Sequence, residues 1–151
     1  MKLKILVGSG RKIGLFTLPF LIAGLTLNII FPDFFSVGGP STFLTWVSII
    51  MLVPGIIVWI WSVYLILTKI PKKELITNGP YSIVKHPLYT GVALLVIPGV
   101  GILCNTWLGF FIGAIVYIGS KIYSPEEEKI LEKIFGESWQ YYCRTISIKW
   151  L

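Results

Sequence analysis

The sequence predicts an all-α integral membrane protein with four transmembrane helices and a short cytoplasmic C-terminal amphipathic helical segment. Of its 151 residues, 55% are hydrophobic and only 13% are charged, a balance too apolar for a soluble domain. Four long runs are almost free of charge, and each approaches the ~20 residues that cross ~30 Å of hydrocarbon. We therefore expect residues 1–123 to form a four-span transmembrane region. Residues 124–151 are expected to form a cytoplasmic helical segment that completes a functional site at the ends of the spans.

The first two predicted spans are long and uninterrupted by charge. The first runs from Ile13 to Phe31 and ends at Pro32, where a short outer loop begins. No small-residue cleavage site follows it, so we expect it to be retained as a span. The second runs from Phe43 to Thr68 and carries Pro54-Gly55 in its interior, where proline removes a backbone donor and predicts a kink.

The third and fourth predicted spans form a tight hairpin. They run from Leu88 to Cys104 and from Trp107 to Tyr123, and only Asn105-Thr106 separates them. Small residues recur on both, which predicts a close approach of the two backbones; these are Pro98, Gly99, Gly101, Gly109 and Gly113. The cytoplasmic ends of the two spans must then be neighbours.

A short amphipathic helix is predicted after the fourth span. Ser124 suits an N-cap, Pro125 suits the first helical position, and Glu127 falls at the capping-box position. Apolar residues then recur at helical spacing as far as Gly136. A further stretch, Ser138 to Arg144, brings aromatic side chains toward the same membrane boundary.

The distribution of basic residues predicts the orientation of the chain in the membrane. Lysine and arginine occur before the first span, between the second and third, and at or after the end of the fourth. The other two connections contain neither. The positive-inside rule therefore places both termini, the middle loop and any site formed there in the cytoplasm. The net charge of +6 is accounted for by topology and anionic head groups, without nucleic acid.

Two polar clusters lie at the cytoplasmic ends of the predicted hairpin. The first spans Asn78 to Gly91 and contains the only histidine, His86; the second spans Ser124 to Gly136 and contains three consecutive glutamates. Each cluster has a plain structural explanation, since glutamates favour a first helical turn and tyrosines anchor membrane helices. The hairpin nevertheless predicts that both clusters share one site. The two cysteines, Cys104 and Cys143, fall at opposite ends and are expected to be separate thiols.

Together the clusters resemble a known enzyme family. The motifs are Gly79-Pro80-Tyr81, Lys85-His86-Pro87-Leu88-Tyr89-Thr90-Gly91, the run from Glu127 to Gly136, and an aromatic tail from Trp139 to Tyr142. Their joint spacing resembles the isoprenylcysteine carboxyl methyltransferase family and its relatives among phospholipid methyltransferases. The chain departs from that pattern in having Lys85 where arginine is usual and Ser82 after Tyr81.

This resemblance implies an S-adenosyl-L-methionine-dependent methyltransferase without a metal site. The residues implied to bind the methyl donor are Tyr81, His86, Pro87, Tyr89, Glu127, Glu128 and Tyr142. Aromatic faces and a carboxylate suit its sulfonium cation. Lys85, Glu128 and Arg144 are the implied catalytic residues, the two basic ones orienting a carboxylate acceptor. Glu127 and Glu128 are favoured over Glu126, which shares a polar face with lysines.

The acceptor and the class of protein remain open at this stage. An isoprenylcysteine-type carboxylate is the favoured lipophilic acceptor, and a phospholipid amine or a small thiol are alternatives. In a structural membrane protein, both clusters would serve only as membrane anchors, and S-adenosylmethionine would not bind. A sterol reductase is a further alternative, although no nicotinamide signature is seen. A transporter is disfavoured because no charge lies at mid-depth in any span.

Overall fold

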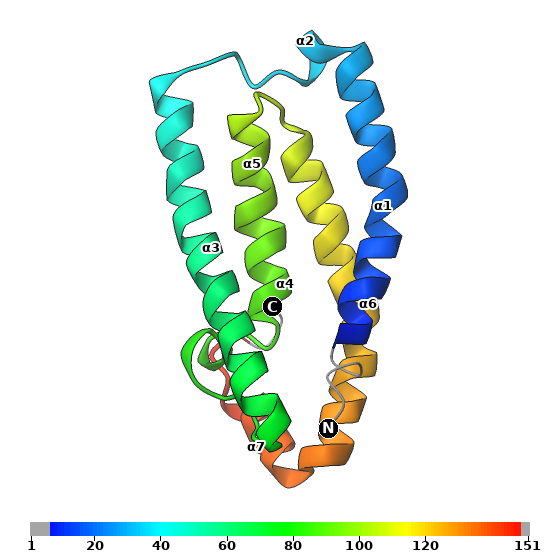
Figure 1. Cartoon of the computed structure of the whole chain (residues 1–151), viewed down its shortest axis with the longest axis vertical. Helices are drawn as coiled ribbons and strands as arrows, with labels where there is room; N and C mark the ends of the chain where they lie inside the picture. The colour runs from blue at the N-terminus through cyan, green and yellow to red at the C-terminus, as the bar shows by residue number, and fades with distance from the viewer. Residues whose placement is uncertain (1–6, 149–151) are drawn as a thin grey trace.

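The computed structural model describes residues 7–148 as a bundle of helices joined by short loops (Figure 1). Within these residues the backbone forms no strand, and a single isolated parallel bridge links Val84 to Ile148. The helices are α1 (Val7–Ile30), α2 (Pro32–Phe35), α3 (Thr42–Lys69), α4 (Pro87–Gly91), α5 (Ile97–Leu103), α6 (Leu108–Phe135) and α7 (Glu137–Thr145). Two 3-10 turns, η2 (Ile70–Lys72) and η3 (Gly79–Ser82), and a π-helical segment, η4 (Val92–Val96), complete them.

Three helical segments are long and apolar enough to cross a membrane: Ser9–Ile30, Thr42–Lys72 and Leu108–Phe135. The third predicted span, Leu88 to Cys104, corresponds to a shorter apolar helix, Pro87–Leu103, made of α4, η4 and α5 in succession. The all-helical membrane architecture is thus confirmed. A fourth complete span and the cytoplasmic orientation stay predictions.

The backbones of α5 and α6 approach each other closely, as the small residues predict. A Cβ atom added to Gly101 would lie 2.7 Å from the Cα atom of Gly109. One added to Gly113 would overlap the carbonyl oxygen of Ala93, in η4. Both positions therefore require glycine for packing, and the hairpin is held tight along much of its length.

The outer loop is fastened to the tip of this hairpin. The Trp107 amide donates to the carbonyl oxygen of Phe35 at 3.0 Å. The Gly39 amide donates to Oδ1 of Asn105 at 2.9 Å, and Asn105 has a left-handed backbone with φ 53°. The loop that joins α1 to α3 therefore closes over the hairpin at the end of the bundle opposite α7 (Figure 1).

The prediction that a new helix begins at Ser124 is wrong. Helix α6 continues without a break from Leu108 to Phe135, so Ser124 is not an N-cap, Pro125 lies inside the helix, and Glu127 is not in a capping box. The physical reason is packing on one face. Its buried residues recur at helical spacing across position 124: Gly119, Ser120, Ser124, Glu127 and Leu131. A helix that is already wound and packed against α1 tolerates the missing proline amide.

At the end of α6 the chain turns through Gly136, whose φ is +51°, and α7 folds back beneath the bundle (Figure 1). Trp139 and Tyr142 of α7 are buried in a cluster with residues from α3 and α6. The chain after α7 then joins the loop before α4, where the Ile148 amide donates to the carbonyl oxygen of Ile83 at 2.9 Å. The loop that carries the histidine motif is therefore held by the C-terminal part of the chain.

The hairpin contact generates a stability prediction. In Gly109→Ala the added methyl group would lie 2.7 Å from the carbonyl oxygen of Ile97, so α5 and α6 must separate. We expect the free energy of unfolding to fall by about 1–3 kcal/mol, as in other overpacked sites. Reversible unfolding in detergent micelles, followed by circular dichroism, measures this change.

Gly14→Ala is the matched control, because Gly14 is also helical and a Cβ atom there meets nothing within 4 Å. Alanine should leave the stability at this position unchanged or raise it slightly. Equal stabilities of the two variants would contradict the assigned contact.

Candidate functional site

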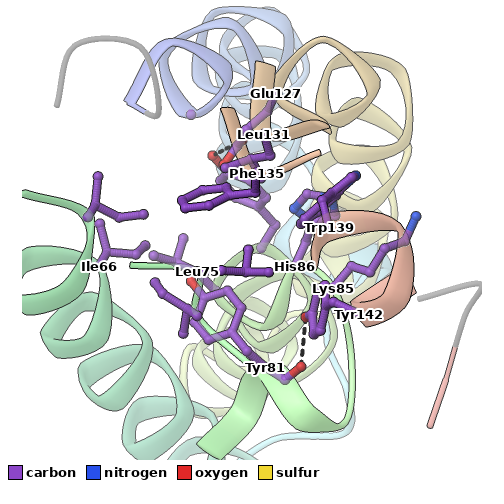
Figure 2. Close-up of a pocket in the computed structure, with 15 residues that line it drawn as sticks. Ile66, Leu75, Tyr81, Lys85, His86, Glu127, Leu131, Phe135, Trp139 and Tyr142 are labelled. Atoms are coloured by element: carbon purple, nitrogen blue, oxygen red, sulfur yellow. Dashed lines mark hydrogen bonds between the residues drawn. The ribbon is translucent and has the colours of Figure 1, made fainter. Parts of the chain in front are cut away.

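A cavity of about 200 Å³ lies among the ends of α3, α6 and α7 and the chain between α3 and α4 (Figure 2). Its walls are mainly apolar, and six ionisable side chains interrupt them: Tyr81, Lys85, His86, Tyr89, Glu127 and Tyr142. The apolar walls come from Ile66, Ile70, Leu75, Ile76, Leu88, Leu131, Phe135 and Trp139, and Gly10 of α1 closes one side. We call this space the donor cavity, after the methyl donor that the resemblance of the motifs implies for it.

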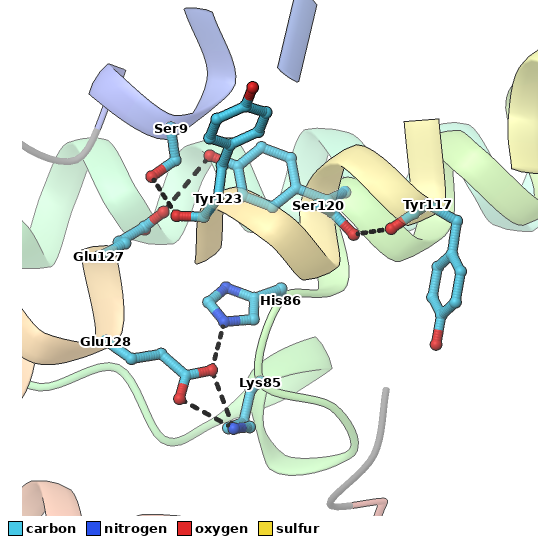
Figure 3. Close-up of polar contacts among 9 residues, drawn as sticks. Ser9, Lys85, His86, Tyr117, Ser120, Tyr123, Glu127 and Glu128 are labelled. Carbon is cyan, nitrogen blue, oxygen red and sulfur yellow. Dashed lines mark hydrogen bonds and ion pairs between the residues drawn. The ribbon is translucent and has the colours of Figure 1, made fainter. Parts of the chain in front are cut away.

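The two polar clusters meet through Glu128. Lys85 Nζ donates to both carboxylate oxygens of Glu128, at 2.8 and 3.0 Å. His86 Nε2 lies 2.9 Å from Oε1 of the same carboxylate (Figure 3). All three side chains are partly buried, which strengthens the interaction relative to an exposed ion pair. Glu128 therefore fixes the orientation of the lysine and the imidazole without lining the donor cavity itself.

Glu127 faces the donor cavity from α6 and is only 8% exposed. The Tyr89 hydroxyl lies within weak hydrogen-bonding distance, donating to Oε2 at 3.5 Å. Ser9 of α1 lies beside it, and its hydroxyl donates to the Tyr123 carbonyl at 3.4 Å (Figure 3). Burying a carboxylate with so few hydrogen-bond donors costs free energy. This position is therefore suited to a cationic or hydroxyl-bearing ligand.

Two tyrosines form a rigid wall between α7 and the loop before α4. The Tyr142 hydroxyl donates to the carbonyl oxygen of Tyr81 at 2.7 Å (Figure 2). Burial raises the pKa of both phenols above its ordinary value, and the nearby charge of Glu127 adds to the rise for Tyr81. Both rings are therefore neutral at physiological pH and present uncharged aromatic surface and hydroxyl groups.

The structure brings together most of the predicted site residues. Six of them line the donor cavity, and Glu128 holds two of those six in place. Pro87 is fully buried and lines a groove on the other side of α4. Arg144 is exposed on α7 and does not line the donor cavity. Glu126 is exposed, pairs with Lys12 of α1 and does not line the donor cavity.

Sequence reasoning missed the apolar walls and the contribution of α1. Leu75 and Ile76 lie in an irregular segment whose side chains no periodic pattern assigns to a face. Gly10 comes close enough that a Cβ atom there would lie 3.6 Å from the Tyr89 hydroxyl. No motif marks Ser9 or Gly10, because their role depends on α1 packing against α6.

A model of the phospholipid methyltransferase family matches residues 41–138. The chain belongs to this family. The match confirms the relationship inferred from the motifs and extends it to α3, in which no motif is visible. None of the curated proteins and none of the solved structures compared with the chain matches it.

Membership of the phospholipid methyltransferase family indicates a membrane methyltransferase. The matched region contains His86, Glu127 and Glu128, together with the start of α7. Gly10 and Tyr142 line the same cavity but lie outside it. The donor cavity is thus built partly from the matched region and partly from segments on either side.

The hydrogen bond between α7 and the loop generates a prediction that concerns stability. Tyr142→Phe leaves the partly buried carbonyl of Tyr81 without its hydrogen-bond donor, and we expect the free energy of unfolding to fall by about 1 kcal/mol. Tyr141→Phe removes the same hydroxyl from a neighbouring residue that is 71% exposed, and should have no measurable effect. Unfolding in detergent compares the two, and an equal response would argue against a structural role for this bond.

Proposed function

We propose that the protein is an S-adenosylmethionine-dependent membrane methyltransferase that acts on a lipophilic acceptor, with an isoprenylcysteine-type carboxylate as the favoured one. The observation that carries the proposal is the donor cavity itself. It joins a buried carboxylate, an oriented imidazole and several aromatic faces in a chain of the phospholipid methyltransferase family. A purely structural membrane protein would not need to bury Glu127 beside an apolar cavity.

The chemistry of the cavity walls fits S-adenosylmethionine. Leu131, Phe135 and Trp139 provide apolar surface for the adenine ring. Glu127 and the neutral faces of Tyr81 and Tyr89 suit the cationic end of the donor, through charge attraction and cation–π contact. Lys85 and His86 would hold its amino-acid carboxylate or meet the acceptor.

Glu128 acts as a positioning residue in this proposal. It accepts two hydrogen bonds from Lys85 and lies 2.9 Å from the His86 ring. Without it, two basic side chains would lose their common partner and gain rotamer freedom. The charge that they present to the cavity would then no longer be fixed in direction.

The walls of the cavity favour methyl transfer by excluding water. When bound, S-adenosylmethionine supplies a methyl group on a sulfonium sulfur, which keeps the bonding electron pair as the methyl passes to an acceptor oxygen. Such a reaction brings opposite charges together, so a cavity with mainly apolar walls favours it. Lys85 orients the acceptor carboxylate as a point charge, since lysine lacks the planar fork of arginine. Arg144 is exposed on α7 and does not line the cavity, so it has no part in this proposed step.

A phospholipid amine is the second candidate acceptor, and the name of the matched family supports it. An amine must release a proton when it is methylated. Glu127 is the buried carboxylate that faces the donor cavity and would accept that proton. A small thiol has no specific observation in its favour.

Donor binding tests the proposal directly. We expect isothermal titration of the detergent-solubilised protein with S-adenosylmethionine, or with S-adenosylhomocysteine, to show one site. Glu127→Gln should weaken binding of the cationic donor by about 30-fold, corresponding to about 2 kcal/mol for a desolvated charge partner. Glu126→Gln is the control, because Glu126 lies one residue away but is exposed. Absence of binding by folded protein would remove the enzymatic proposal.

A comparison of acceptors tests the favoured substrate. The protein, supplied with isotopically labelled S-adenosylmethionine, is offered S-farnesyl-N-acetylcysteine or phosphatidylethanolamine, and methylated lipid is measured by mass spectrometry. We expect the farnesylated carboxylate to be methylated, and Lys85→Met to lower that rate more than Lys129→Met does. Methylation of phosphatidylethanolamine alone would assign the second candidate instead.

A further inference from the structure

The first turns of α1 that the structure describes are packed against α6. Ile13 is only 4% exposed, and the Phe16 ring meets the Tyr123 ring edge-on, with 6.1 Å between the ring centroids. Gly119 of α6 makes room for this contact, because a Cβ atom there would lie 3.0 Å from Cδ1 of Phe16. Ser9 lies one helical turn before Ile13 and therefore on the same face of α1. The packing thus holds Ser9 against α6.

The Ser9 hydroxyl lies next to the Glu127 carboxylate (Figure 3). Ser9 is 5% exposed, and its hydroxyl donates to the carbonyl oxygen of Tyr123 at 3.4 Å, which is long for such a bond. The Ser9 side chain is also hydrogen-bonded to Glu127. A hydroxyl has a single proton to donate, and a charged carboxylate is a stronger acceptor than a backbone carbonyl. The Ser9 proton is therefore best placed on Glu127 when that carboxylate is charged.

The other donors near Glu127 are weak or already engaged. The Tyr89 hydroxyl lies 3.5 Å from Oε2 of Glu127. Lys85 Nζ and the His86 ring bind Glu128 instead. A hydrogen bond to a buried carboxylate stabilises its charged form and restricts its rotation. Ser9 is therefore the residue of α1 best placed to hold the charged Glu127 in one orientation.

Ser9 itself is not among the described residues that line the donor cavity, although its neighbour Gly10 and its partner Glu127 both line it. The Ser9 hydroxyl therefore acts on a bound molecule through Glu127 and not by direct contact. The backbone of α1 also comes close to Tyr89, since a Cβ atom at Gly10 would lie 3.6 Å from the tyrosine hydroxyl. One short segment of α1 thus adjoins both the acidic and the aromatic group proposed to meet the cationic end of the donor.

We propose that Ser9 is a positioning residue that directs the Glu127 carboxylate toward the cationic end of bound S-adenosylmethionine. This inference rests on the proposed donor binding and adds a residue to it. Ser9 lies outside the matched residues 41–138, so the family match assigns it no role. Without its hydroxyl, Glu127 keeps only the weak bond from Tyr89 and gains rotamer freedom. The cation would then meet a carboxylate that is no longer fixed in direction.

Isothermal titration with S-adenosylmethionine tests this role. Ser9→Ala should weaken binding about tenfold, the effect of losing a hydrogen bond to a charged group. Thr17→Val is the matched control, because Thr17 is also buried on α1 but its hydroxyl donates to the carbonyl oxygen of Ile13 in the same helix, at 2.8 Å. This control should bind the donor as tightly as the wild type. Unchanged binding by Ser9→Ala would overturn the inference.

A double-mutant cycle separates positioning from a general structural effect. If Ser9 acts through Glu127, the variant that combines Ser9→Ala with Glu127→Gln should bind about 30-fold more weakly than the wild type, as Glu127→Gln alone does. A loss of about 300-fold, the product of the two single effects, would show that Ser9 acts independently, and the assignment would be wrong. Gel filtration and thermal unfolding establish that every variant is folded. Failure of the folded wild type to bind the donor would remove the proposed function itself, whereas the other adverse outcomes contradict only the role of Ser9.

Discussion

The close approach of α5 and α6 is the constraint on which the candidate site depends. Glycines at positions 101, 109 and 113 let the two backbones touch, so the hairpin has little freedom to splay or slide. The two motif clusters, at the end of the hairpin away from its turn, therefore lie side by side. Glu128 meets a histidine that is 42 residues earlier in the chain, at 2.9 Å. A wider hairpin would move the acidic turn away from the imidazole, and the donor cavity would lose one of its walls.

Two neighbouring glutamates have different tasks because the helix directs them differently. Glu128 binds Lys85 and His86, whereas Glu127 is buried at the cavity wall with few hydrogen-bond donors nearby. A partly buried ion pair of this kind contributes more to geometry than to stability, since desolvation offsets much of its attraction. Glu127 accepts only a weak hydrogen bond from Tyr89 and is the carboxylate that we propose contacts a ligand. Under that proposal, two adjacent glutamates of one helical turn serve architecture and recognition separately.

The sequence was sufficient for the membrane architecture, the hairpin and the pairing of the two motif clusters. The length of a charge-free run and the spacing of small residues can be read directly from the sequence, and these two properties determine membrane spans and close helix contacts. It was not sufficient at Ser124, where capping residues predicted a helix start inside α6. Capping rules describe only local preference. Here the packing of the buried face of α6 against α1 outweighs that preference and keeps the helix continuous. Gly10 and Leu75 also escaped notice, because their places in the cavity depend on how distant elements pack.

The donor cavity takes walls from α1 and from the distal part of α7, and both lie outside the matched residues 41–138. The matched segment on its own would leave the cavity open on two sides. The enclosure can therefore be altered by substitutions that leave every matched motif residue in place. A change in the helix that precedes the matched segment would alter the shape of the space that a small molecule meets, with no change at His86 or Glu128.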